Sequence, residues 1–86
     1  MVIIYSSKFA REYRKLSTIV KDMAEEQESI FRKNPFDSRL KTHKLKGKLI
    51  GFLSFSIGFK HRIIFEFSMD KKTAYFHSVG DHDIYE

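Results

Sequence analysis

The order of apolar and polar residues divides the chain into a short strand, two helices and three further strands. Residues 2–5 form an apolar run rich in β-branched side chains, which is typical of a strand. Apolar residues then recur at helical spacing on both sides of a break near Ser17–Thr18, so we expect an amphipathic helical hairpin. Ser6 or Ser7 can cap its first helix. Asn34–Pro35 should end the second, because proline lacks an N–H and disfavours the α conformation in the residue before it.

The second half of the chain has the two-residue period of strands. In residues 52–57 large apolar residues alternate with two serines, which predicts a half-buried strand with the serines on its outer side. Gly58 should turn the chain, and residues 61–67 and 73–79 then predict two strands joined by a turn over residues 68–72. The order β-α-α-β-β-β predicts an α+β fold, in which a helical hairpin packs on one face of a mostly antiparallel sheet and the other face is open and concave.

The length and composition indicate a single domain over residues 1–86, because so short a chain has room for one core. The chain has no cysteine, which fits the cytoplasm and removes any thiolate metal site. The first residues lack the pattern of a signal peptide, and no apolar run approaches the roughly 20 residues needed to cross a bilayer. We therefore expect a soluble cytoplasmic protein without a membrane contact.

The positive charge is concentrated in the middle of the chain. Residues 32–62 hold nine Lys or Arg and one Asp or Glu, a net charge of +8. Residues 1–31 hold five basic and five acidic residues, and residues 63–86 hold two basic and five acidic residues. A basic block of this kind is typical of surfaces that bind polyanions or an acidic protein, although many charge runs are only solvated surface.

Several motifs in this order resemble those of one toxin superfamily. They are the helix stop Asn34–Pro35–Phe36, the run His43-Lys44-Leu45-Lys46-Gly47, the pair Gly51–Phe52, the strand Arg62-Ile63-Ile64-Phe65 and the ending Gly80-Asp81-His82-Asp83-Ile84-Tyr85. Together they resemble the RelE/ParE superfamily of type II toxin-antitoxin modules, over nearly the whole chain. Within it the sequence is most similar to the RelE, YoeB and YafQ type. That resemblance implies a toxin that cleaves mRNA on the ribosome and stops translation.

The resemblance also implies a catalytic set. Metal-free RNA cleavage needs a base for the 2′-OH proton, a cation for the transition state and an acid for the leaving oxygen. By resemblance His43 stands where a candidate base is expected, Arg62 where a phosphate-binding arginine is expected and His82 where a C-terminal acid is expected. The further residues expected to bind RNA or phosphate are Lys44, Lys46, Lys48, Lys60 and Tyr85. No metal or cofactor is implied.

Other roles for these residues stay open. A histidine in a Lys-rich loop is ordinarily a surface residue, and Arg62 could form a structural salt bridge with Glu66. His61 shares a strand face with apolar residues and is expected to be a packed structural histidine, while the face of His77 is undecided. A zinc site built from histidines alone is a weaker alternative, because the basic surroundings oppose a dication.

Two other function classes remain. A noncatalytic toxin of the ParE type would inhibit DNA gyrase and has no chemical need for two titratable groups beside a cation. A plain RNA-binding module is a weaker option, because the sequence has no aromatic RNP-like platform. For a toxin the resemblance implies a cognate antitoxin, and the basic block favours one with an acidic, amphipathic segment that folds as it binds. The other partners would be the ribosome and mRNA.

Overall fold

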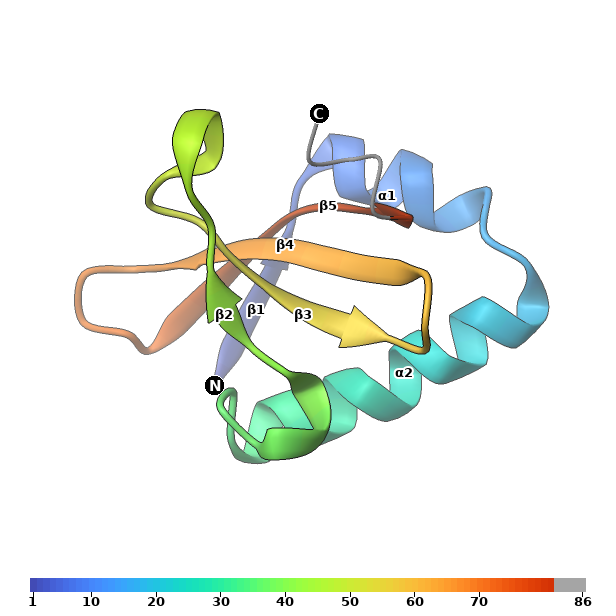
Figure 1. Ribbon diagram of the computed structural model, residues 1–86, viewed down its shortest axis with the longest axis horizontal. Coiled ribbons are helices and arrows are strands. Elements are labelled where there is room, and N and C mark those ends of the chain that lie inside the picture. Colours follow the sequence, from blue (N-terminus) through green and yellow to red (C-terminus); the bar gives the residue numbers. More distant parts are fainter. Residues whose placement is uncertain (82–86) are drawn as a thin grey trace.

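The sheet and its two helices form the two layers of a computed structural model that describes residues 1–81 (Figure 1). In chain order the elements are β1 (Val2–Tyr5), α1 (Ser7–Arg14), α2 (Thr18–Lys33), the 3-10 helix η1 (Ser38–Leu40), β2 (His43–Lys44), the 3-10 helix η2 (Gly47–Leu49), β3 (Leu53–Ile57), β4 (His61–Phe67) and β5 (Thr73–Asp81). The predicted α+β class, with helices against a mostly antiparallel sheet, is confirmed.

Two serines set the starts of the helices. Ser6 precedes α1, and its Oγ accepts a hydrogen bond from the Phe9 N–H at 2.9 Å. Ser17 precedes α2 and accepts in the same way from the Val20 N–H at 3.2 Å. Each serine satisfies a backbone donor that the first helical turn leaves without a partner. The second helix ends at Lys33, directly before the predicted stop at Asn34–Pro35.

The five strands lie in the order β1-β5-β4-β3-β2. Neighbouring strands are antiparallel, except that β1 runs parallel to β5. Between β4 and β5 the register shifts: Ile64 pairs with Ser78, but the next residue of β4, Phe65, pairs with Phe76. His77 is therefore the extra residue of a β-bulge, which bends the strand and increases its twist locally.

The core lies between the helices and one face of the sheet. Phe31 of α2 is fully buried, and its ring centroid lies 4.9 Å from those of Phe55 and Phe65 and 5.4 Å from that of Phe76. Phe9 of α1 reaches the same cluster, with its ring 5.5 Å from that of Phe76. Because successive strand residues point to opposite faces, the alternate positions of β3, β4 and β5 lie on the face away from the helices. We call it the open face.

Three features differ from the sequence expectations. The segment between α2 and β3 contains η1, the two-residue strand β2 and η2, none of which was expected, because elements of two or three residues have no detectable period. The last strand continues to Asp81 rather than ending at residue 79. Ser54 and Ser56 lie on the open face as predicted, but they are buried rather than exposed, at 0% and 7% exposure.

Candidate functional site

The open face brings together the first two residues of the predicted catalytic set. His43 pairs with Ser54 of β3, and Arg62 pairs with Ser56 of the same strand from its other side. Cross-strand partners project to the same face, so both side chains lie on the open face, one on each side of β3. With strands about 4.8 Å apart and about 3.3 Å of rise per residue, their Cα atoms are separated by about 12 Å. Two long side chains can converge on a phosphate across that distance.

One ring nitrogen of His43 contacts the backbone, and the other has no partner among residues 1–81. The residue is exposed on the edge strand β2, and its Nδ1 lies 3.1 Å from the carbonyl oxygen of Lys41. A carbonyl oxygen only accepts, so Nδ1 carries the proton of that hydrogen bond and Nε2 of the neutral ring keeps its lone pair. Lys41 ends η1 in a left-handed conformation, with a positive φ of 53°. The geometry suits a general base.

Arg62 keeps its positive charge unneutralised by any acid of residues 1–81. Its Nη1 donates to the carbonyl oxygen of His61 at 3.0 Å and, at 3.5 Å, to that of Phe59. The structural salt bridge with Glu66 is not formed, because positions four apart on one strand have Cα atoms about 13 Å apart. The guanidinium is thus fixed at the end of the open face, with donors left for an anion.

The predicted RNA-binding lysines are exposed but do not form one cluster. Lys44 pairs with Leu53, so it projects to the face opposite that of His43. Lys46 and Lys48 belong to the η2 segment, which stands clear of the sheet in Figure 1. Lys60 lies in the turn between β3 and β4, two residues before Arg62. Of the four, only Lys60 is adjacent to Arg62 in the fold, and phosphate binding by each remains a prediction.

The remaining predicted site residues, His82 and Tyr85, lie outside the described residues. His61 is partly buried and pairs with Ile57 and Asp81, which agrees with a structural role. In the described part of the chain no group of three or more acidic residues, histidines or cysteines is placed to hold a metal ion. No helix within residues 1–81 has the length and apolar character to span a membrane.

Sequence reasoning missed a pocket beside this set on the open face. The pocket has a volume of about 290 Å³ and is lined by Ile4, Ser6, Phe52, Glu66, Tyr75, Phe76 and His77. Three of its polar side chains, Glu66, Tyr75 and His77, come from β4 and β5, where Glu66 pairs with Tyr75. The bulge places His77 against Phe52, with ring centroids 5.1 Å apart. Only the alternation of Glu66 and Tyr75 within their strands could have indicated a shared face.

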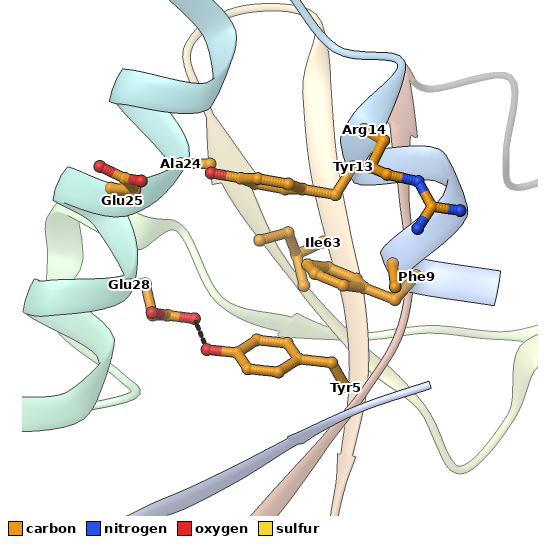
Figure 2. Close-up of a pocket in the computed structure, with 9 residues that line it drawn as sticks. Tyr5, Phe9, Tyr13, Arg14, Ala24, Glu25, Glu28 and Ile63 are labelled. Atoms are coloured by element: carbon orange, nitrogen blue, oxygen red, sulfur yellow. Dashed lines mark hydrogen bonds between the residues drawn. The ribbon is translucent and has the colours of Figure 1, made fainter. Parts of the chain in front are cut away.

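A second cavity, of about 400 Å³, lies between α1 and α2 (Figure 2). Phe9, Ala24 and Ile63 supply apolar walls, while Glu28 stands at its edge and accepts a 2.6 Å hydrogen bond from the Tyr5 hydroxyl. Burial raises the pKa of Tyr5, and the Glu28 carboxylate raises it further, so this phenol stays a neutral donor. The cavity is on the helical side of the sheet, away from His43 and Arg62.

Comparison with known proteins gives structural matches. No protein-family model matches the sequence, and no curated protein matches it either. The YoeB/ParE toxin from Agrobacterium tumefaciens superposes with a TM-score of 0.80 at 18% identity, over 95% of this chain and 99% of that one. YafQ from Escherichia coli gives 0.78 at 17% identity, over 95% and 93%. A chain of the toxin-antitoxin complex RelBE2 from Mycobacterium tuberculosis gives 0.70 at 17% identity, over 94% and 96%. The chain therefore has the fold of RelE/ParE toxins, as the sequence resemblance implied.

Proposed function

We propose that the chain is the toxin of a type II toxin-antitoxin module and cleaves mRNA on the ribosome without a metal ion. The observation that carries this proposal is the arrangement of His43 and Arg62 on the open face. One offers an imidazole nitrogen with a free lone pair, and the other offers a guanidinium that no acid of residues 1–81 neutralises. A protein that only binds a partner has no chemical need for this combination. The shared fold with YafQ and the YoeB/ParE toxin supports the same function.

The chemistry follows from the roles of the two groups. His43 Nε2 takes the proton of the ribose 2′-OH, and the 2′ oxygen attacks the adjacent phosphorus. Arg62 stabilises the negative charge that develops on the phosphate oxygens as the bond to the 5′ oxygen breaks. His82, by the family resemblance, gives the leaving 5′ oxygen its proton. The products are a 2′,3′-cyclic phosphate and a free 5′-OH.

The test is to map mRNA ends after brief induction of the gene. Wild-type protein should produce discrete 5′-OH ends inside translated reading frames. His43→Ala and Arg62→Ala should each reduce cleavage by about 10² to 10⁴, the usual cost of removing a general base or a charge-stabilising donor. Arg11→Ala, which removes an exposed arginine from the helical side, is the matched control and should cleave normally.

Two results would contradict the nuclease assignment. Full cleavage by both open-face variants would remove the proposed site. Intact mRNA together with inhibited DNA supercoiling would assign the protein to the noncatalytic type that acts on gyrase.

The proposed partner is a cognate antitoxin with an acidic, amphipathic segment. Two observations support it: the net +8 over residues 32–62, and the shared fold with a chain of the RelBE2 toxin-antitoxin complex.

Long-range attraction mainly accelerates association, so raising salt should slow association more than it speeds dissociation. The double variant Lys46→Glu, Lys48→Glu should slow association as added salt does. The same charge reversal at Lys71 and Lys72, outside the basic block, should leave the association rate unchanged. The test is co-purification with the product of the neighbouring small gene, followed by association rates across a salt series. The absence of a complex, or association rates that do not change with salt concentration, would refute an electrostatic contribution to antitoxin binding.

A further inference from the structure

The pocket on the open face combines apolar walls with polar groups that have no structural task. Ile4 and Phe52 form part of its lining, and three polar side chains, Glu66, Tyr75 and His77, converge on it from β4 and β5. Its volume of about 290 Å³ is just below the roughly 300–1,000 Å³ that ligand pockets span, so it suits a small ligand group. An apolar cavity with a few convergent polar groups is the usual form of a small-ligand site.

The three polar groups are not used elsewhere among residues 1–81. The Glu66 carboxylate is exposed and takes part in none of the side-chain hydrogen bonds or ion pairs of this region. The Tyr75 hydroxyl and the ring nitrogens of His77 are likewise unbonded there, although the His77 main-chain carbonyl accepts from Ser6. An exposed carboxylate without a protein partner is hydrated, and it can exchange that water for a donor on a ligand. Glu66 is exposed and lines the pocket, so its carboxylate is available to a ligand there.

We propose that this pocket binds the base of a nucleotide next to the cleaved phosphate and selects bases that carry an exocyclic amino group. The proposal rests on the nuclease function above. The Phe52 and His77 rings, 5.1 Å apart and tilted by 42°, supply flat apolar surface against which a base can stack. A carboxylate accepts hydrogen bonds from amino groups such as N4 of cytosine and repels the O4 carbonyl of uracil.

The position along the sheet fits a base rather than a phosphate. On β4, Ile64 lies between Arg62 and Glu66, two residues from each, so the two charged residues have Cα atoms about 13 Å apart. An extended dinucleotide bridges this distance, with its phosphate at the guanidinium and a flanking base at the pocket. A carboxylate repels phosphate, so Glu66 contributes to base reading and not to backbone binding.

The first experiment compares the sequences at all cleavage sites for two variants. Wild-type protein should disfavour uracil at one position beside the cut. Glu66→Gln, which keeps the shape but loses the charge, should weaken that preference by about five- to tenfold, as expected for one lost base contact. Cleavage itself should continue, because His43 and Arg62 are untouched. Glu26→Gln makes the same charge change on α2 and should leave the preference unaltered.

The second experiment does not depend on cleavage. Cytidine and uridine monophosphates are titrated into the protein, and the ring protons of Tyr75 and His77 are followed by NMR. The dissociation constant obtained from these shifts should be several-fold lower for cytidine monophosphate than for uridine monophosphate. Glu66→Gln should remove this difference. Cleavage with an unchanged base preference in Glu66→Gln, or equal shifts with both nucleotides, would overturn the pocket while leaving the nuclease in place. Selective shifts without RNA cleavage would support the pocket and refute the nuclease.

Discussion

Replacement of Phe31 by alanine is expected to remove the centre of the core. The ring is fully buried, with three aromatic neighbours at centroid distances between 4.9 and 5.4 Å. Truncation of a buried phenylalanine costs about 3–5 kcal/mol, because its transfer free energy is lost and a cavity remains. We expect a value near the upper end, since large rings on several sides cannot collapse into the space. Domains of this length have a total free energy of unfolding of about 4–13 kcal/mol, so the variant should be close to unfolding.

The assay is urea unfolding followed by far-UV circular dichroism. Phe31→Leu keeps most of the volume and should cost about 1–1.5 kcal/mol, which remains measurable if the alanine variant does not fold. Phe36→Ala is the control: this ring is 61% exposed and contacts Phe67 at 6.1 Å, so its loss should cost under about 1 kcal/mol. A cost for Phe31→Ala no larger than that of Phe36→Ala would refute the packing argument.

Three smaller effects follow from single hydrogen bonds and one carboxylate. Glu12→Ala should cost about 1–3 kcal/mol in urea unfolding, because the buried Val79 N–H loses the acceptor that lies 3.1 Å away. Ser6→Ala should cost about 1–2 kcal/mol through the lost helix cap, whereas Ser7→Ala should be nearly neutral. Hydrogen bonds from a neighbouring arginine lower the pKa of Asp37 from 3.8 to about 2. The stabilising contribution of Asp37 is therefore complete above about pH 4 and is lost as the pH falls toward 2. Asp37→Asn should make the urea midpoint of unfolding less dependent on pH over that range.

Each of these predictions has its own control. Lys8→Ala removes only the exposed 4.0 Å ion pair to Glu12, so a cost as large as that of Glu12→Ala would show that the backbone bond is unimportant. Equal costs for the two serine variants would contradict the cap assignment. An acid profile that Asp37→Asn leaves unchanged would mean that other carboxylates govern acid unfolding.

Properties set by neighbouring residues were predictable from the sequence. The strand at residues 61–67 was expected with its bounds, because alternation of side chains along a strand is a local property. The second helix stop was predictable for the same reason, since proline acts on the residue before it. Ser6 and Ser7 were equivalent in sequence, and only the geometry of the first turn selected Ser6.

Properties set by register and by distant pairing were not predictable. Lys44 was grouped with His43 because the two are adjacent in sequence, but adjacent strand residues point to opposite faces, and the two-residue strand β2 gave no period to detect. The pocket around Glu66 depends on a bulge that adds His77 to one strand only, which the sequence of a single strand does not reveal.

The parallel pairing of β1 with β5 ties the beginning of the fold to its last strand. Besides the strand pairing, Ser6 donates to the carbonyl oxygen of His77 and Glu12 accepts from Val79, contacts that span 71 and 67 residues. None of these bonds can form on a nascent chain until β5 has left the ribosome. Closing so long a loop also costs conformational entropy, and the contacts that offset this cost form only afterwards. β1 and α1 therefore lack these partners until β5 has been synthesised, whereas α2 can already pack against β3 and β4. The sheet is completed only with β5.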